Sequence, residues 1–375
     1  MPGIYLHIPF CKKACHYCDF HFSTTPHYKD EILKAIRSEI SLRKDYLGNE
    51  KIETIYFGGG TPSLLSADEL QLLILEITDN YDVSSSAEIT LEANPDDLSP
   101  QKVRELRQTP INRFSIGIQS FFEDDLKWMN RAHTAREAHS AVKRVQDAGF
   151  ENITTDLIYG FPLLSDEKWE YNIHQLIELQ VPHISSYSMT VEPATALSHF
   201  IKTGKQKPMD ENQSAAQFIV LMDLLQEAGF EHYEISNFAK PGMHSRHNSN
   251  YWEGVKYLGI GPSAHSYNGE SRQWNISNNM KYTEAIEMKK IPAEHEILEL
   301  KDRVNEYIMT SLRTSKGMDL EKISKNFGSD YATEIRGGLE PLIDKNWIID
   351  KDQVIILTRE GKLFADHIAS ELFIT

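Results

Sequence analysis

Short strand-like runs alternate with longer helical segments through the first half of the chain, and this alternation constrains the fold most. The runs rich in apolar or β-branched residues are Gly3–Ile8, Thr54–Phe57, Glu88–Leu91, Arg113–Ile118, Asn152–Ile158 and His183–Met189. The amphipathic segments between them are Tyr28–Tyr46, Ala67–Asp79, Pro100–Gln108, Ala135–Ala148 and Asp166–Leu179. Repeated β-then-α units predict an α/β fold, in which a parallel sheet closes in part into a TIM-like (β/α)6 barrel.

Polar and glycine residues stand near the ends of these strands. A cysteine loop follows the first strand and the run Gly58–Thr61 follows the second. Glu92 and Gln119 end the third and fourth strands, and Asp156 lies within the fifth. Because the carboxyl ends of barrel strands share one rim, where barrel enzymes place their chemistry, we expect these residues to form one site.

All three cysteines of the chain lie within one short run, as Cys11, Cys15 and Cys18. An iron–sulfur cube takes four ligands, so three thiolates would leave one iron open for chemistry. A zinc site completed by His16 or His21 is an alternative, although zinc ligands usually come as two pairs from separated turns. A disulfide suits exported proteins, and no apolar export segment is present. The triplet therefore favours a 4Fe-4S cluster.

The composition of the 375 residues is that of a globular protein, with 40% hydrophobic and 25% charged residues. The net charge of −16 argues against a general nucleic-acid binder, which would need a basic face. No run is long and apolar enough to span a bilayer. We therefore expect a cytoplasmic protein without a nucleic-acid partner.

The pattern changes after the sixth strand, and we divide the chain at residues 1–235, 236–290 and 291–375. The middle part is expected to cap the barrel and holds a polar loop at Pro241–Trp252, followed by a glycine-rich stretch at Leu258–Pro262. A linker near Lys289–Pro292 leads into the last part. There, helices at Ile297–Leu312, Asp319–Lys325 and Ala332–Lys345, a hairpin at Trp347–Leu357 and a final helix predict a small winged-helix-like α+β domain. The acidic composition favours packing or partner docking over DNA binding for that domain.

The cysteine triplet, with Tyr17 before its last member, resembles the radical S-adenosylmethionine (SAM) superfamily. The whole run from Tyr5 to Cys11 is similar to the oxygen-independent coproporphyrinogen III oxidase group within it. This resemblance implies a 4Fe-4S cluster on the three cysteines and SAM at the open iron. It further implies that SAM contacts Tyr5, Tyr17, Gly59, Gly60, Thr61, Glu92, Gln119, Arg131 and Asp156.

Each of these positions also has a structural explanation. The glycines alone would suggest a tight strand-to-helix turn. Arg131 and Asp156 could form an internal ion pair, and the two tyrosines could be barrel packing. Glu92 could be an exposed charge at the end of its strand or, when ionised, an acceptor for ribose hydroxyls.

Two features distinguish the chain from the decarboxylating oxidases. Phe20 stands where they carry a further cysteine, and Met1 lies four residues before Tyr5, where they carry an N-terminal extension. The run from His247 to Trp252 resembles instead the HNxxYW motif of the heme-chaperone (HemW-type) branch. A neutral imidazole is a common heme-iron ligand and aromatic rings can stack on the macrocycle. The resemblance implies heme contacts by His247, Asn248, Tyr251 and Trp252; a histidine in a loop that caps the barrel is the structural alternative, and His244 and His265 are alternative ligands.

The resemblance thus implies a heme chaperone that carries a 4Fe-4S cluster and SAM and passes heme to an acceptor hemoprotein, such as a membrane-associated respiratory enzyme. It would be cytoplasmic or peripheral to the membrane, and a homodimer is left open. Two other hypotheses stand beside it. One is an active radical SAM enzyme, either a coproporphyrinogen III oxidase or a methyltransferase acting on a tetrapyrrole-like substrate. The other is a winged-helix regulator with a zinc or redox site.

Overall fold

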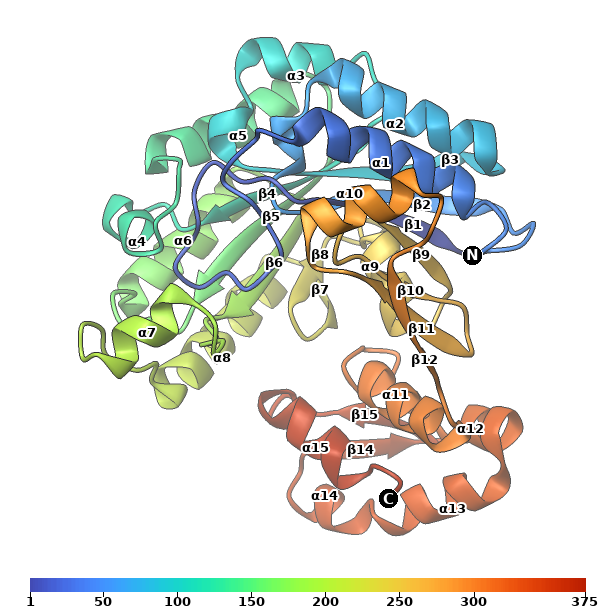
Figure 1. The fold of residues 1–375 in the computed structure, drawn as a ribbon. Helices are drawn as coiled ribbons and strands as arrows, with labels where there is room; N and C mark the ends of the chain where they lie inside the picture. Colours follow the sequence, from blue (N-terminus) through green and yellow to red (C-terminus); the bar gives the residue numbers. More distant parts are fainter.

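A curved sheet of 12 strands forms the body of the computed structural model, which describes residues 1–375 (Figure 1). Its centre consists of the parallel strands β1 (Gly3–Ile8), β2 (Ile52–Gly59), β3 (Val83–Ala93), β4 (Arg113–Gln119), β5 (Asn152–Tyr159) and β6 (His183–Ser188). These strands neighbour one another in chain order. The predicted partial barrel of six parallel strands is therefore confirmed.

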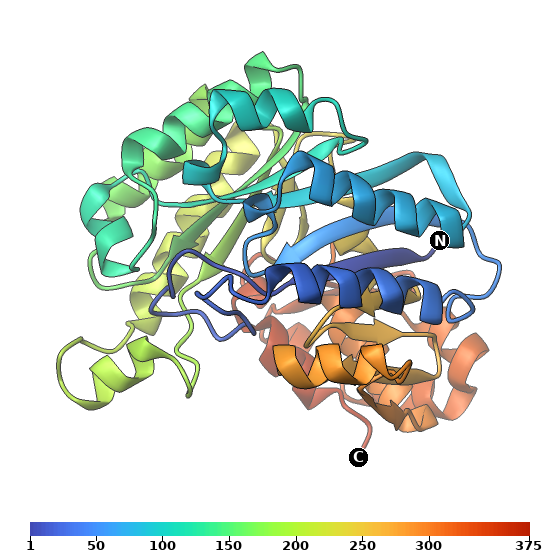
Figure 2. The same cartoon turned by 45° about the horizontal axis from the view of Figure 1, so that its top comes forward.

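Helices cover the outer face of the central strands (Figure 2). They are α1 (Lys29–Leu42), α2 (Ala67–Asn80), α3 (Pro100–Leu106), α5 (Ala135–Asp147) and α6 (Asp166–Glu178). Ser66 and Thr134 begin two of them with reciprocal capping boxes, in which a glutamate three residues on returns the hydrogen bond. The short helices α4 (Glu123–Trp128) and α7 (Ala196–Lys202) were not predicted, because each is too short to show a helical period.

Further strands extend both edges of the central sheet. Beyond β6 lie β8 (Asn237–Ala239) and β7 (Glu231–Glu234), which follow helix α8 (Glu211–Glu227). Beyond β1 lie β9 (Tyr257–Ile260), β10 (His265–Tyr267), β11 (Ser271–Asn275) and β12 (Ala293–Ile297), with α10 (Asn279–Glu287) packed against α1. A single core of 61 buried residues reaches from Ile4 to Ile286. The sheet therefore runs continuously through the sequence divisions expected at residues 235 and 290.

The segment expected to be a polar loop, Pro241–Trp252, ends in a helix, and that part of the prediction is wrong. Helix α9 spans Arg246–Trp252, and the Ser245 hydroxyl caps it by accepting the Asn248 N–H at 3.3 Å. No glycine or proline interrupts these seven residues, so the serine cap suffices to begin a helix there.

The C-terminal unit has its own core of 17 buried residues and lies below the sheet in Figure 1. It consists of α11 (Leu300–Leu312), α12 (Leu320–Phe327), α13 (Ser329–Gly337), α14 (Glu340–Asp344) and α15 (Ala365–Glu371) around an antiparallel sheet of β13 (Met318–Asp319), β15 (Val354–Leu357) and β14 (Ile348–Lys351). The helix predicted over Ala332–Lys345 is divided in two, because Gly337-Gly338 and Pro341 interrupt it. The small α+β domain is confirmed.

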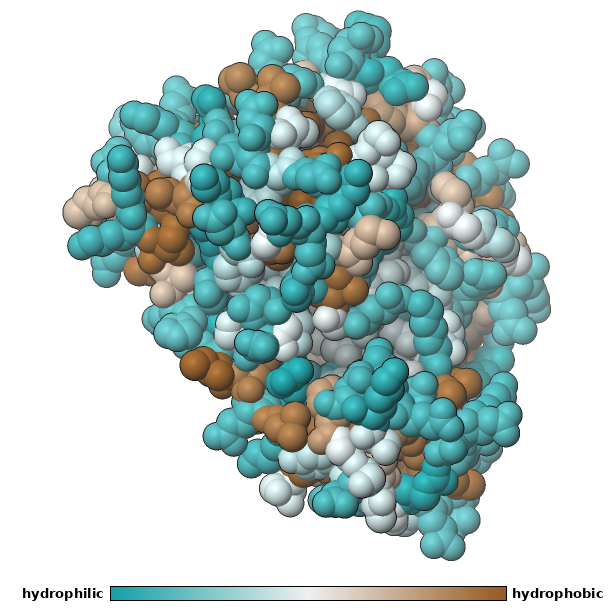
Figure 3. All heavy atoms as spheres, turned by 90° about the vertical axis from the view of Figure 1, so that its right-hand side faces the viewer, coloured by the Kyte–Doolittle hydropathy of each residue, from teal (hydrophilic) through white to brown (hydrophobic).

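The surface seen from the right-hand side of Figure 1 is mostly hydrophilic, and its apolar side chains form small separate patches (Figure 3). This fits the excess of acidic over basic residues, 55 against 39. None of the helices is both long and apolar enough to cross a membrane.

Candidate functional site

The cysteine loop connects β1 to α1 at the carboxyl rim of the sheet and is held by backbone hydrogen bonds. The Cys11 N–H donates to the Ser23 carbonyl at 3.0 Å, and the His16 N–H donates to the Met129 carbonyl at 3.1 Å. All three thiols are unpaired and partly buried. The loop therefore presents Cys11, Cys15 and Cys18 together at the rim where the sequence placed the site.

Donors from two neighbouring loops lie beside two of these thiols. The Thr61 hydroxyl lies 3.4 Å from the Cys11 sulfur, and a guanidinium nitrogen of Arg131 lies 3.4 Å from the Cys15 sulfur. Burial raises the pKa of the Cys18 thiol to about 12, and the two other thiols add to this effect. Thiols must lose their protons to bind iron, so metal binding here is coupled to proton release.

No group of three or more His, Cys, Asp or Glu side chains lies close enough to hold a single metal ion. A cube, in contrast to a single ion, binds each cysteine to a different iron, and its thiolates stand farther apart. The donor chemistry of the loop, three thiols with a guanidinium beside them, fits such a cluster.

Arg131 joins the cysteine loop to the strand ends. Its guanidinium donates to the Asn94 side-chain oxygen at 2.6 Å and the Gly117 carbonyl at 2.8 Å, and it reaches the Tyr17 hydroxyl at 3.4 Å. Asn94 in turn donates to the Thr61 hydroxyl at 3.2 Å. Asn94 was not predicted as a site residue, although it stands two residues after Glu92 at the same strand end. The ion pair of Arg131 with Asp156 does not form.

Two partly buried carboxyl groups, those of Glu92 and Asp156, lie inside the barrel next to this rim. Glu92 accepts a hydrogen bond of 2.8 Å from the Tyr56 hydroxyl. Burial raises the pKa of Glu92 to about 8, and the neighbouring charge of Asp156 adds to this effect. Burial also raises the pKa of Asp156, to about 6. The raised pKa favours the neutral form of Glu92, and a ligand or a cation that stabilises its charge would favour the ionised form.

Several buried polar atoms near the rim have no hydrogen-bond partner. Among them are the side-chain oxygen of Gln119 and the Nε of Arg131. Unpaired buried polar groups are costly, and a polar ligand in this space could satisfy them. A nucleoside with an amino-acid tail, such as SAM, has donors and acceptors of the required kind. The residues thus fit SAM.

The glycines of the rim are required by packing within the protein. Gly59 has a φ of 101°, and a Cβ there would lie 2.6 Å from the ring of His7. A Cβ on Gly60 would lie 2.6 Å from the Phe10 carbonyl oxygen. The end of β2 therefore approaches the chain that leaves β1 too closely for any side chain. This supports the tight-turn explanation of these glycines.

His247 lies at the opposite, amino-terminal end of the barrel. It contacts Thr54, which pairs with Gly3 at the start of β1, and its side chain is only 2% exposed. Its Nδ1 is 2.7 Å from the Thr54 hydroxyl and its Nε2 is 2.9 Å from the Tyr251 hydroxyl. Burial lowers the pKa of His247 to about 3, so the ring is neutral. In this conformation neither ring nitrogen is free to bind iron.

The rings of His247, Tyr56 and Tyr5 form one stacked cluster inside the barrel. The His247 ring stacks on Tyr56 with 4.9 Å between the centroids and on Tyr5 at 6.5 Å, and Tyr56 stacks on Tyr5 at 6.1 Å. The Tyr56 hydroxyl also donates to Glu92, so this cluster links α9 to the partly buried carboxyl groups near the rim. Tyr56 was not predicted as a site residue.

The remaining residues of the HNxxYW segment point in different directions. Tyr251 faces inward to His247, whereas Trp252 lines a pocket between α9 and the C-terminal unit. The Asn248 N–H takes part in the helix cap. Of the alternative histidines, His244 lines the same pocket as Trp252, and His265 is exposed on β10. The motif therefore has a buried face and a face that borders a pocket.

Comparisons with known proteins place this site in a family. The model of the radical SAM superfamily matches residues 5–176, and that of the HemN C-terminal domain matches residues 298–364. The heme chaperone HemW of Bacillus subtilis is 33% identical over 98% of this chain and 98% of its own. The chain belongs to the HemW family of radical SAM proteins.

A second HemW protein supports this assignment, and a solved structure shares the fold. The heme chaperone HemW of Lactococcus lactis is 35% identical over 95% of this chain and 93% of its own. The solved structure of the coproporphyrinogen III oxidase HemN from Escherichia coli, a radical SAM enzyme, superimposes with a TM-score of 0.85 over 99% of this chain and 90% of its own. At 23% sequence identity, that likeness shows the fold that the HemW family shares with HemN.

Proposed function

We propose that this protein is a heme chaperone, which binds heme and passes it to acceptor hemoproteins while carrying a 4Fe-4S cluster and SAM on its barrel. The observation that carries the proposal is the similarity to proteins described as heme chaperones, which extends over nearly the whole chain. The HNxxYW segment and Phe20, which replaces the additional cysteine of the decarboxylating oxidases, agree with it.

In this proposal Cys11, Cys15 and Cys18 hold the cluster, and Arg131 balances the negative charge of their thiolates. When bound, the cluster and SAM supply one-electron chemistry at the open iron. Gln119 and Arg131 offer their unpaired polar atoms to SAM, and Glu92 accepts hydrogen bonds from it once ionised. Tyr5, Tyr17, Thr61 and Asp156 complete the surroundings, with Gly59 and Gly60 shaping the turn beside them.

Heme, as cargo, binds at the HNxxYW segment of His247, Asn248, Tyr251 and Trp252. Since the carboxyl rim and α9 lie at opposite ends of the barrel, the cluster and heme occupy separate sites. The acceptor is a hemoprotein, and a membrane-associated respiratory enzyme fits a cytoplasmic donor that docks at the membrane surface. The segment can therefore hold heme without displacing SAM.

An anaerobic heme titration of the cluster-reconstituted protein, followed by the Soret band, tests the proposal. Saturable one-to-one binding is expected for the wild type and for Cys15→Ala, which loses the cluster but keeps the heme site. His247→Ala is expected to bind heme at least about tenfold more weakly, because α9 loses its anchor in the barrel. Non-saturating binding by the wild type would contradict heme carriage. Cleavage of SAM coupled one-to-one to a changed tetrapyrrole would support an active radical SAM enzyme instead.

A further inference from the structure

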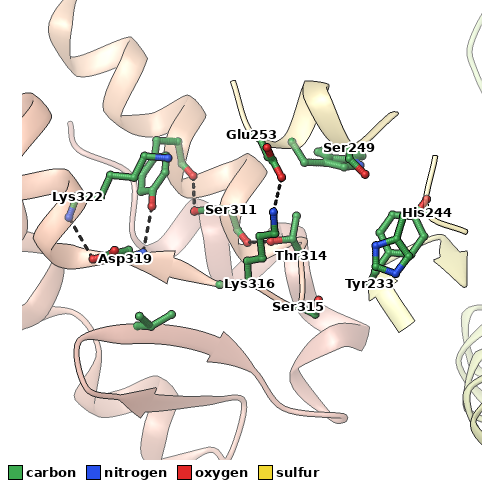
Figure 4. A pocket seen from close by; sticks show the side chains of 14 residues that line it. Tyr233, His244, Ser249, Glu253, Ser311, Thr314, Ser315, Lys316, Asp319 and Lys322 are labelled. Atoms are coloured by element: carbon green, nitrogen blue, oxygen red, sulfur yellow. Dashed lines mark hydrogen bonds and ion pairs between the residues drawn. The ribbon is translucent and has the colours of Figure 1, made fainter. Parts of the chain in front are cut away.

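A pocket of about 280 Å³ lies between α9 and the C-terminal unit (Figure 4). Backbone hydrogen bonds connect its two sides: the Ser315 N–H donates to the Tyr233 carbonyl at 3.0 Å, and the Ile235 N–H donates to the Arg313 carbonyl at 3.0 Å. The two walls are therefore fixed relative to each other. Ligand pockets commonly measure ~300–1,000 Å³. Because this pocket is slightly smaller than that range, it can hold one edge of a macrocycle and would leave the rest in solvent.

Aromatic side chains from three elements line the pocket. Tyr233 comes from β7, Trp252 from α9 and Tyr307 from α11. Tyr233 is held in place because its hydroxyl hydrogen-bonds the buried His183 at 2.7 Å. The guanidinium of Arg313 lies over the Trp252 ring, 5.3 Å from its centroid. A flat apolar ligand would find preorganised surfaces on both sides of the pocket.

His244 provides an accessible imidazole in this pocket. Its side chain is 40% exposed and its ring stacks on Tyr233 with 4.2 Å between the centroids. Its Nε2 hydrogen-bonds the Glu231 carboxylate at 2.8 Å, and its Nδ1 makes no hydrogen bond. Histidines that bind metals usually donate their second ring N–H to a carboxylate or carbonyl, which fixes the orientation and the tautomer of the ring. His244 has this arrangement, whereas both nitrogens of His247 are engaged.

Two lysines, Lys316 and Lys322, line the pocket away from the imidazole, together with the carboxylates of Glu253 and Asp319. Lys316 pairs with Glu253 and its side chain is 76% exposed, and the ammonium group of Lys322 lies 4.8 Å from the Tyr307 ring centroid. Figure 4 shows His244 and Tyr233 at one end of the pocket and Lys322 and Asp319 at the other. A ligand that spans the pocket would thus meet an imidazole at one end and an ammonium group at the other.

We propose that this interdomain pocket is the heme site, with His244 as the iron ligand and with Lys316 and Lys322 facing the carboxylates of the macrocycle. The proposal rests on the heme chaperone function proposed above and names the face of the HNxxYW segment that the cargo uses. In it, His247 is a positioning residue: it anchors α9 in the barrel and so holds Trp252 at the pocket. Partial exposure of the macrocycle allows an acceptor to reach it.

Four variants of the full chain, titrated anaerobically with hemin, test this proposal. His244→Ala is expected to weaken binding at least about tenfold and to change the Soret and visible bands, because the axial ligand is lost. His265→Ala removes an exposed histidine from β10 and is the matched control; its titration should equal that of the wild type. His247→Gln keeps one donor and one acceptor for Thr54 and Tyr251, so it should weaken heme binding less than His244→Ala does and should keep the bands of the iron ligand. Circular dichroism confirms that each variant is folded.

The fourth variant, Lys316→Glu with Lys322→Glu, is titrated with hemin and with hemin dimethyl ester. The wild type is expected to prefer hemin about tenfold, and the double variant should lose this preference because the ester carries no carboxylates. The assignment of His244 as the iron ligand would be overturned if His244→Ala kept the wild-type spectrum and affinity while His247→Gln lost the bands of the iron ligand. Heme carriage itself would not be contradicted by that result. Failure of the wild type itself to bind hemin would contradict the function and the pocket together.

Discussion

Glu88 should be the residue that keeps α9 against the barrel, and its replacement by glutamine should destabilise the protein strongly. The side chain is 4% exposed and accepts the backbone N–H groups of His247 at 3.0 Å and Arg246 at 3.2 Å. It also faces the buried Arg113, whose Nε is 3.9 Å away and has no hydrogen-bond partner. The Glu88 carboxylate thus accepts hydrogen bonds from the first turn of α9 and also faces a buried guanidinium.

The magnitude follows from these contacts. Glutamine has one acceptor oxygen, so at least one N–H of α9 loses its charged acceptor, at a cost of about 1.5–3 kcal/mol. Removing one partner of a buried ion pair costs ~3–5 kcal/mol, and the long 3.9 Å separation from Arg113 places this pair at the low end. The two losses share one side chain and do not add in full, so we expect Glu88→Gln to lower the free energy of unfolding by about 3 kcal/mol.

Urea unfolding of the anaerobic apoprotein, followed by circular dichroism, measures this loss. The barrel and the C-terminal unit have separate cores, so the transition of the barrel is fitted on its own. Glu53→Gln is the control, because Glu53 pairs with the half-exposed side chain of Arg246, at the same turn of α9. Glu53→Gln should lower the free energy of unfolding by no more than about 1 kcal/mol. Equal losses in the two variants would refute the role assigned to Glu88.

Two further predictions concern the rim of the barrel. Because burial raises the pKa of Glu92 to about 8, the folded apoprotein binds a proton that the unfolded chain releases near the ordinary carboxyl pKa. The free energy of unfolding is therefore highest at acidic pH and falls as the pH rises towards 8. The melting temperature of the wild type should decline between pH 5.5 and 8.5, and Glu92→Gln should make this decline smaller. Gly60→Ala should lower the free energy of unfolding by at least ~2 kcal/mol, because its Cβ would lie 2.6 Å from the Phe10 carbonyl oxygen. A third prediction concerns the C-terminal unit. Gly337 is a helical glycine with open space around it, so Gly337→Ala should raise the free energy of unfolding by up to ~1 kcal/mol in the same urea titration.

The barrel could be predicted from the sequence because its signals are local. Each parallel strand is a short apolar run, and Ser66 and Thr134 mark the helix starts with capping boxes. The rim residues followed from the same reasoning, since the carboxyl ends of parallel strands meet. The cysteine triplet could be recognised from the sequence alone, because what identifies it is the spacing of the three cysteines along the chain.

The environment of His247 could not be predicted, because it depends on contacts far apart in the sequence. Thr54 lies 193 residues from His247 and Glu88 lies 159 residues from it. Both begin predicted strands, but no local pattern links either of them to His247. Helix α9 is seven residues long and mostly polar, so its composition resembled a loop. The interdomain pocket likewise depends on how the C-terminal unit docks against α9.

Heme transfer is the most direct test of the proposed function. The heme-loaded protein is mixed anaerobically with the apo form of a membrane-associated respiratory hemoprotein, and acceptor heme and SAM are quantified together over time. A heme chaperone should lose its Soret signal as the acceptor gains heme and activity, without one-to-one consumption of SAM. Retention of heme by the donor, or SAM cleavage that matches the appearance of a modified tetrapyrrole, would contradict it.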